Sequence, residues 1–185
     1  MSSDVIRIAG VVNDSIVDGP GIRVSIFAQG CSHGCVGCHN PQTHDFLGGE
    51  EFSCDEILSQ IRKNPLASGI TFSGGDPFFQ AEGFYTLAKA LRQEKKKYEI
   101  AAYTGFTWEY LVSFGSEYQQ KLLEELDILV DGPFVQECMN LDLLFRGSAN
   151  QRIINVPASL KNVVWGENPV KEPVLCTTKR WIGKK

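Results

Sequence analysis

The sequence lacks the features that would assign it to a membrane or to a nucleic acid. No stretch approaches the roughly 20 apolar residues that a membrane-spanning helix needs, and the N-terminal MSSDVIRIAG lacks the basic and then apolar pattern of a signal peptide. The 18 lysines and arginines are outnumbered by 22 acidic residues, whereas a nucleic-acid-binding domain needs clustered basic residues. We therefore expect a cytoplasmic protein that binds neither membrane nor nucleic acid.

Repeats, low-complexity tracts and linker-like segments are also absent. The chain has 185 residues, of which 43% are hydrophobic and 22% charged, so it is long enough to bury one sizeable core. We expect a single domain over residues 1–185. In a reducing compartment the six cysteines would remain thiols, and clustered cysteines there are more often ligands than disulfides.

Hydrophobic periodicity predicts strands that alternate with helices. Strands are expected at residues 23–28, 68–72, 98–103 and 127–130, and helices after a Ser53–Glu56 capping box, over residues 84–91, after Thr107 and over residues 117–126. The βαβαβαβ order favours an α/β fold with mostly parallel strands, either an open sheet or an incomplete, partial TIM-like βα barrel. A complete barrel takes about 250 residues, and each candidate site follows a strand, where such folds collect ligands.

The segment Gly30–Asn40, GCSHGCVGCHN, carries three cysteines within eight residues. Four chemistries use such a run. Haem attachment through Cys35, Cys38 and His39 normally follows export, and a redox pair of cysteines normally opens a helix that glycines do not favour. A structural zinc site completed by His33 or His39 is the strongest competitor of the fourth chemistry, a [4Fe–4S] cluster held at three corners.

Three thiolates would leave one iron of a cubane without a protein ligand, so that a small chelating molecule could bind there. The glycines of the loop, Gly30, Gly34 and Gly37, would let it turn sharply and bring amides close to sulfur. The other cysteines, Cys54, Cys138 and Cys176, have no mutual ligand spacing and are expected to be buried free thiols.

Several motifs resemble those of a known family. The C-x-x-x-C-x-x-C spacing of Cys31, Cys35 and Cys38 is similar to that of radical S-adenosylmethionine (SAM) enzymes. The segment SGGDP, residues 73–77, lies where those enzymes bind SAM. Taken alone, SGGDP would be interpreted as an ordinary strand-to-helix turn.

Three further segments resemble a narrower group within that family. DGPGIR at residues 18–23 and HNP at residues 39–41 resemble activating enzymes that install glycyl radicals on partner proteins. RGSANQR at residues 146–152 resembles the C-terminal part of the activases of anaerobic, class III ribonucleotide reductase. The resemblance covers about residues 14–155.

The resemblance implies a set of cofactor ligands. Cys31, Cys35 and Cys38 would bind a [4Fe–4S] cluster, and the amine and carboxylate of SAM would chelate its open iron, where one electron splits SAM to a hydrogen-abstracting 5′-deoxyadenosyl radical. No further catalytic side chain is predicted. The SAM-binding residues that the resemblance implies at the methionyl end are Gly74, Gly75, Asp76 and Pro77: the two glycines would let backbone groups approach the methionyl ammonium without a Cβ in the way, and Asp76 and Pro77 would fix the turn. At the adenine end they are Gly37, Cys38 and His39, and Thr104 and Asp131 would lie near the methionyl part or a cation.

Some of these assignments have ordinary structural alternatives. Many activases have an aromatic residue where this chain has Gly37, so stacking would come from His39 or elsewhere, and His39 would otherwise be a surface histidine. Thr104 and Asp131 would otherwise be turn residues. The two arginines Arg23 and Arg152 would meet a carboxylate or the partner, with an exposed salt bridge as the common alternative.

The resemblance also implies a reaction and its partners. The enzyme would use SAM and a low-potential electron donor such as flavodoxin or ferredoxin to create a glycyl radical on anaerobic ribonucleoside-triphosphate reductase. An unclosed barrel would leave a lateral entrance for the glycine-bearing loop of the reductase. The alternatives are a radical SAM enzyme acting on another glycyl radical enzyme or on a small molecule, as a deazapurine-type synthase does, and a zinc-stabilised binding module.

Overall fold

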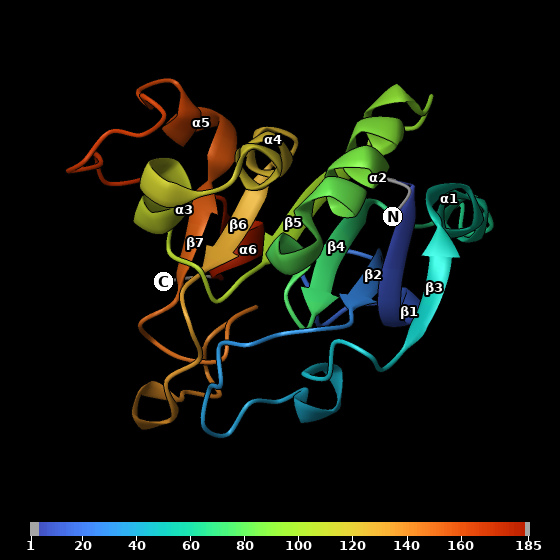
Figure 1. Cartoon of the computed structure of the whole chain (residues 1–185), viewed down its shortest axis with the longest axis horizontal. Helices are drawn as coiled ribbons and strands as arrows, with labels where there is room; N and C mark the ends of the chain where they lie inside the picture. Colours follow the sequence, from blue (N-terminus) through green and yellow to red (C-terminus); the bar gives the residue numbers. More distant parts are fainter. Residues whose placement is uncertain (1–3, 184–185) are drawn as a thin grey trace.

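A seven-stranded sheet in the order β3-β1-β2-β4-β5-β6-β7 forms the centre of the protein, in a computed structural model that describes residues 4–183 (Figure 1). The central strands β2, β4, β5 and β6 are parallel, while β1, β3 and β7 join the edges in antiparallel pairs. The strands are β1 (Val5–Ser15), β2 (Arg23–Ala28), β3 (Glu50–Ser53), β4 (Gly69–Gly74), β5 (Glu99–Tyr103), β6 (Ile128–Asp131) and β7 (Arg152–Asn155).

The longer helices cover one face of the sheet, and the loops that follow the parallel strands gather at its lower edge in Figure 1. Within residues 4–183, none of the helices has the length and apolar character needed to cross a bilayer. The helices are α1 (Cys54–Arg62), α2 (Ala81–Gln93), α3 (Trp108–Phe114), α4 (Glu117–Glu124), α5 (Val156–Leu160) and α6 (Lys179–Ile182), with 3-10 turns η1 (Pro41–Thr43), η2 (Pro77–Gln80) and η3 (Gln136–Cys138).

The expected alternation of strands and helices is confirmed from β2 to β6. Ser53 and Glu56 form the reciprocal capping box at the start of α1, and Thr107 accepts the cap bond of α3 from Tyr110 N. The antiparallel strands β1, β3 and β7 are additional to the prediction. The result is a mixed sheet with a parallel centre, and closure into a partial barrel stays a prediction.

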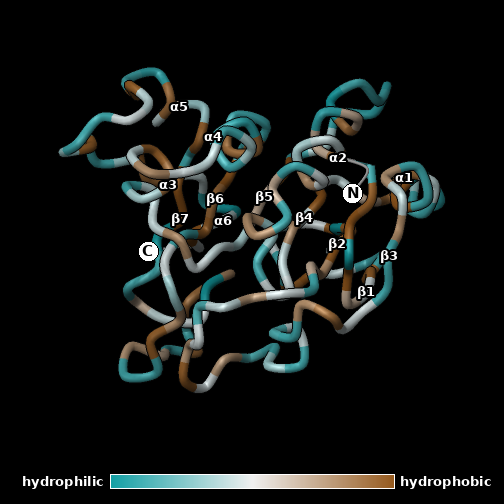
Figure 2. The backbone as a smooth tube through the Cα atoms, viewed as in Figure 1, coloured by the Kyte–Doolittle hydropathy of each residue, from teal (hydrophilic) through white to brown (hydrophobic). Residues whose placement is uncertain are grey.

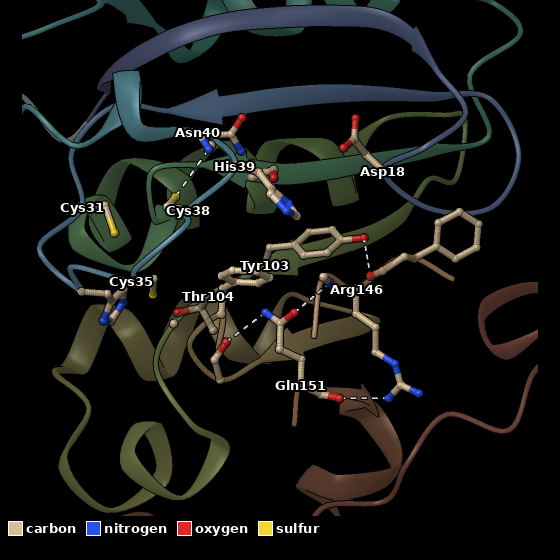
Figure 3. A pocket seen from close by; sticks show the side chains of 18 of the residues that line it. Asp18, Cys31, Cys35, Cys38, His39, Asn40, Tyr103, Thr104, Arg146 and Gln151 are labelled. Atoms are coloured by element: carbon tan, nitrogen blue, oxygen red, sulfur yellow. Dashed lines mark hydrogen bonds between the residues drawn. The ribbon is translucent and has the colours of Figure 1, made fainter. Parts of the chain in front are cut away.

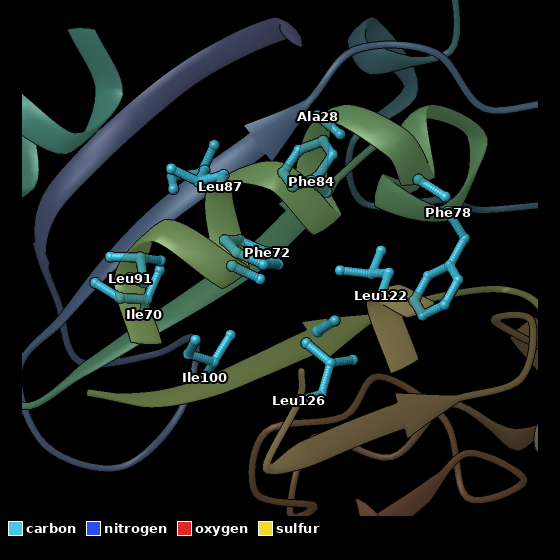
Figure 4. Packing of buried hydrophobic residues seen from close by; sticks show 14 of the residues in the cluster. Ala28, Ile70, Phe72, Phe78, Phe84, Leu87, Leu91, Ile100, Leu122 and Leu126 are labelled. Carbon is cyan, nitrogen blue, oxygen red and sulfur yellow. The ribbon is translucent and has the colours of Figure 1, made fainter. Parts of the chain in front are cut away.

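The covered face of the sheet packs against α2 (Figure 4). Phe84 of α2 lies with its ring centroid 5.0 Å from that of Phe72 in β4, and Leu87 and Leu91 are fully buried over the same strands. Burying each such side chain stabilises the fold by about 1.5–3 kcal/mol. Hydrophobic residues are frequent along the central strands and alternate with hydrophilic ones along the helices (Figure 2). This packing holds the end of β4, where the SGGDP segment begins.

A second, smaller core occupies the opposite face at β5, β6 and β7. Residues of these strands alternate between the two cores, since Ile100 and Leu129 belong to the first and Ala101 and Val130 to the second. Trp181 of α6 fills this second core and is 1% exposed. The two cores, one on each face of the sheet, hold the carboxyl ends of the four parallel strands at one edge of the sheet.

Candidate functional site

A cavity of about 540 Å³ lies at the carboxyl ends of the parallel strands. Its size falls within the roughly 300–1,000 Å³ of pockets that hold a cofactor or drug-sized ligand. Residues after all four parallel strands line it, together with the loop of residues 132–151. The cavity therefore brings together segments that the motif analysis had treated separately (Figure 3).

The thiols of Cys31, Cys35 and Cys38 all line this cavity, on the side formed by the cysteine loop, residues 30–40. All three are partly exposed free cysteines. Asn40 N donates to Cys38 Sγ at 3.4 Å, which is the amide-to-sulfur contact expected of this loop. Burial raises the pKa of the Cys31 thiol, and a hydrogen bond from the backbone N–H of His33 partly offsets this.

The thiols do not converge on a point. Among residues 4–183, no three His, Cys, Asp or Glu side chains are grouped as ligands of one metal ion, whereas zinc needs sulfurs about 2.3 Å from a single centre. Gly34 and Gly37 have φ of 66° and 74°, a left-handed conformation that glycine adopts without strain. A loop that turns at both positions places all three thiols on the cavity.

The buried carboxylate of Asp76 joins three segments at the floor of the site. Its Oδ2 accepts hydrogen bonds from Thr104 Oγ1 at 2.7 Å and from Gly105 N at 2.9 Å, and it lies 2.6 Å from His33 Nε2. Its Oδ1 accepts from Phe78 N at 2.9 Å, which caps η2. Asp76 thus serves as a structural junction, and its side chain lies outside the cavity lining.

Of the two other residues expected at the methionyl end, Thr104 lines the cavity and Pro77 does not. Pro77 is the first residue of η2 and is buried, so it shapes the turn from outside the cavity lining. Thr104 does line the cavity, but its hydroxyl donates to Asp76 and accepts from Phe106 N at 3.1 Å. Direct contact of either residue with SAM stays a prediction.

Gly74 and Gly75 line the cavity, and the structure gives a different reason for glycine there from the one expected. A Cβ on Gly74, whose φ is 95°, would lie 2.6 Å from Ala28 N. A Cβ on Gly75 would lie 2.6 Å from Gly30 O and 2.9 Å from Thr43 O. The chain's own backbone therefore occupies the space: Gly74 lets the end of β4 approach β2 closely, and Gly75 lets it approach the start of the cysteine loop.

His39 and Gly37 lie against the loop that follows β6. The His39 ring centroid is 4.9 Å from that of Phe134, and a Cβ on Gly37 would lie 3.2 Å from Gln136 Oε1. Phe134 lines the cavity and was missed by the sequence analysis. It supplies an aromatic ring beside the last cysteine, where Gly37 offers none.

Asp131 lies outside the cavity lining. Its Oδ2 accepts from Trp108 N at 2.7 Å, at the start of α3, and Arg152 Nε donates to its Oδ1 at 3.0 Å. Arg152 also forms a bidentate ion pair with Glu109, in which Nη1 donates to Oε1 at 2.9 Å and Nη2 donates to Oε2 at 2.8 Å. Arg152 thus forms partly exposed salt bridges within the chain, which was the ordinary structural alternative, and contact of Asp131 with SAM or a cation stays a prediction.

Arg23 is fully buried, so an exposed salt bridge is the wrong description of it. It pairs with Glu99 at 2.9 Å and donates to Thr71 Oγ1 at 2.6 Å. Burial lowers its pKa, and Glu99 opposes this. Thr71 in turn donates to the carbonyl of Asp18 at 2.8 Å, so Arg23 helps to position a residue of the cavity wall.

Several other cavity residues were missed by the sequence analysis (Figure 3). Tyr103 donates from its hydroxyl to Phe145 O at 2.9 Å, and burial raises its pKa. Gln151 Oε1 accepts from Gly147 N at 2.9 Å while Arg146 Nη1 donates to Gln151 O at 2.9 Å. A signal was present for some of them, since Tyr103 precedes Thr104, and Asp18, Asn40, Arg146 and Gln151 lie in the motifs DGPGIR, HNP and RGSANQR. Lining residues without such a signal include Phe134, Leu141 and Phe145.

The remaining cysteines are free and separate from the site. Cys54 and Cys176 are buried as expected, whereas Cys138 is half-buried because it lies in a surface turn. Burial raises the pKa of Cys54 to about 11. Cys54 is therefore a protonated, unreactive thiol at neutral pH.

Comparisons with known proteins agree with this geometry. Residues 17–154 match the family model of a 4Fe-4S single cluster domain. The chain is 35% identical over 144 residues to the anaerobic ribonucleoside-triphosphate reductase-activating protein of Vibrio cholerae, covering 75% of this chain and 90% of that protein. The protein of that name from Escherichia coli K12 is 33% identical, covering 74% and 90%.

Two more distant matches complete the comparison. The activating protein of enterobacteria phage T4 is 31% identical, covering 74% of this chain and 86% of that protein. The crystal structure of QueE from Escherichia coli overlaps with a TM-score of 0.44 at 17% identity, covering 69% and 70% of the two chains. By its sequence, this chain belongs to the family of anaerobic ribonucleoside-triphosphate reductase-activating proteins.

Proposed function

We propose that this protein is a radical SAM activase that generates a glycyl radical on anaerobic ribonucleoside-triphosphate reductase. The observation that carries the proposal is the shared cavity, which the three thiols, Gly74 and Gly75 of SGGDP, and the RGSANQR segment all line. The relatives at 31–35% identity are named as activating proteins of that reductase. The three motifs that resemble those of activases therefore meet in one cavity.

Each part of the cavity has a role in this proposal. Cys31, Cys35 and Cys38 hold a [4Fe–4S] cluster by three irons. When bound, the cluster supplies the electron that cleaves the sulfonium of SAM. Gly74 and Gly75 present backbone groups to the methionyl end of SAM, because both line the cavity and close contacts with β2 and with Gly30 fix their positions.

The cavity wall formed by Phe134, Tyr103 and Phe145 is proposed to hold the adenosyl end of SAM and to exclude water. Phe134, packed on His39, offers a flat apolar surface for a base. Tyr103 and Phe145 continue this wall, and the Tyr103 hydroxyl is already bonded within the protein. Apolar walls suit a radical reaction because they keep reactive side chains and solvent away from the reacting carbon.

The protein substrate must reach this carbon directly, so we propose that the sheet is an incomplete βα barrel and that the glycine-bearing loop enters through its open side. Leu141 lines the cavity and is 87% exposed, which is consistent with an entrance that a partner covers. The reductant is proposed to be an external low-potential donor such as flavodoxin or ferredoxin. Oxygen-sensitive thiolate ligation suits the cytoplasm.

The test is electron paramagnetic resonance (EPR) of the reconstituted protein mixed anaerobically with SAM, dithionite and the cognate reductase. The proposal predicts a glycyl doublet that needs both SAM and the reductase. A cluster that cleaves SAM but gives no doublet would contradict the assignment of the partner. Turnover of a free metabolite without the reductase would favour the small-molecule alternative.

A further inference from the structure

His33, midway between Cys31 and Cys35, is bonded to Asp76 of the SGGDP segment. His33 Nε2 lies 2.6 Å from Asp76 Oδ2, and the Asp76 side chain is 1% exposed. Thr104 Oγ1 and Gly105 N already donate to the same oxygen, so this oxygen is an acceptor and Nε2 carries the donated hydrogen. The bond ties the cysteine loop to the segments that follow β4 and β5.

The His33 ring is enclosed by apolar neighbours. Its centroid lies 5.2 Å from that of Phe79 and 4.7 Å from that of Phe106. Gly105 faces the ring so closely that a Cβ there would lie 2.4 Å from His33 Cδ2. Because water competes little in such surroundings, a hydrogen bond to a carboxylate holds the ring firmly.

Apart from the packing of the His33 ring, this part of the loop has few contacts that hold it. Within residues 4–183, the His33–Asp76 contact is the one hydrogen bond that ties residues 32–34 to a distant part of the chain. The loop entry is fixed by backbone bonds at Cys31, but Gly34 has open space beside its Cα. The position of this imidazole therefore decides the path of the backbone between the first two cysteines.

The same contact orients an amide toward a thiol. The backbone N–H of His33 lies close enough to the Cys31 sulfur to lower the pKa of that thiol, against the effect of burial. Hydrogen bonds to sulfur ligands help to set the reduction potential of an iron–sulfur cluster. If the loop relaxed after loss of the imidazole contact, this amide would turn away from the sulfur.

We infer that the His33–Asp76 pair positions the cluster ligands, an inference that rests on the proposed function. Asp76 holds His33, and His33 holds the backbone that spaces Cys31 and Cys35 and presents an amide to Cys31. The pair also links this loop to Thr104 on the cavity wall. Both are positioning residues, outside the set of iron ligands.

The test compares His33→Ala and Asp76→Asn with the wild type and with His44→Ala. The His44 ring forms none of the hydrogen bonds found within residues 4–183, so its removal is a matched control in the same region. After anaerobic reconstitution, iron and sulfide per chain, the cluster midpoint potential and the EPR line shape are measured. The rate of SAM cleavage without reductase should fall about 10- to 100-fold in both pair variants, with an altered potential and line shape, while His44→Ala matches the wild type.

Two more variants distinguish the loss of the His33–Asp76 hydrogen bond from the mere loss of side-chain volume at residue 33. A glutamine amide can donate to Asp76, so His33→Gln should restore most of the potential and the rate. Gly105→Ala keeps both polar groups but displaces the ring, so it should resemble His33→Ala. A His33→Ala protein with wild-type potential, line shape and SAM cleavage would overturn the inference. Absence of SAM cleavage in the wild type would instead count against the proposed function.

Discussion

A Cβ atom on Gly75 would lie 2.6 Å from the carbonyl oxygen of Gly30, so the SGGDP segment and the cysteine loop meet with no room for a side chain. The adjoining amide of Asp76 donates to that carbonyl at 3.1 Å. Two motifs that are distant in sequence therefore form one backbone unit. The relative position of the proposed cluster and SAM sites is set by this contact.

Gly75→Ala should disturb that unit. The added methyl group must displace backbone, which costs about 1–3 kcal/mol in packed surroundings, so the apo-protein should unfold at lower urea and the reconstituted protein should hold less iron. Gly10→Ala is the control, because a Cβ there meets nothing within 4 Å. Equal iron content and equal SAM cleavage in Gly75→Ala and wild type would show that the contact has no functional role.

Replacing each of Cys31, Cys35 and Cys38 by serine should abolish the brown colour and at least most of the bound iron. Each variant removes one of the three thiols that line the cavity. Cys138→Ser is the matched control, since Cys138 is also a half-buried free cysteine and should leave the absorption spectrum unchanged. A Cys138→Ser protein that lost its cluster would mean that the ligand set has been misassigned.

Leu141→Asp should separate SAM cleavage from activation of the reductase. Leu141 lines the cavity and is 87% exposed, so a charge at this proposed entrance would oppose docking of an apolar surface while leaving the cysteine loop unchanged. We expect at least a tenfold smaller glycyl signal, equivalent to about 1.4 kcal/mol of binding, with unchanged SAM cleavage without reductase. Leu66→Asp, at a residue 71% exposed and outside the cavity lining, should match the wild type in both assays. Equal glycyl signals in the two variants would exclude an entrance at Leu141.

The Glu109–Arg152 pair predicts a specific pH dependence. Hydrogen bonds from Arg152 hold the pKa of the Glu109 carboxyl below its usual value of 4.5. A carboxyl whose pKa is lower in the folded state stabilises the fold above its unfolded pKa and loses that contribution as the pH falls through the folded pKa. Glu109→Gln should therefore lower the free energy of unfolding at pH 7, by less than about 1 kcal/mol because the pair is partly exposed.

Urea titrations at neutral pH and at several values below pH 4.5 measure this effect. The difference between the wild type and Glu109→Gln should shrink steadily on acidification below 4.5, the usual value for this carboxyl. A difference that grew as the pH fell would have the wrong sign for a stabilised carboxylate, and would contradict the assigned ion pair.

The central fold was predictable because the residues of each parallel strand are enough, by themselves, to indicate a strand. Residues 23–28 coincide with β2, and the Ser53 and Thr107 caps form as expected. The edges were not predictable in the same way. β1 has an irregular burial pattern interrupted by register shifts, and β3 and β7 have four residues each, so their identity depends on neighbours that lie far away in sequence.

The spacing of the three cysteines correctly indicated that they lie together, since all three line one cavity, and their role as cluster ligands stays a prediction. The site was less predictable where the position of a side chain depends on contacts between segments that are distant in sequence. A sequence cannot show that the Asp76 carboxylate faces His33 and Thr104 instead of a ligand, or that Asp131 is used by Arg152. It also gave no sign that Phe134 packs on His39, because that contact joins loops after different strands.

The most direct test of this account is Mössbauer spectroscopy of ⁵⁷Fe-reconstituted protein before and after addition of SAM, under anaerobic conditions. The account predicts a [4Fe–4S] cluster in which SAM changes the spectrum of one iron and leaves the other three, held by Cys31, Cys35 and Cys38, unchanged. A spectrum of four equivalent sites that SAM leaves unaltered would contradict it.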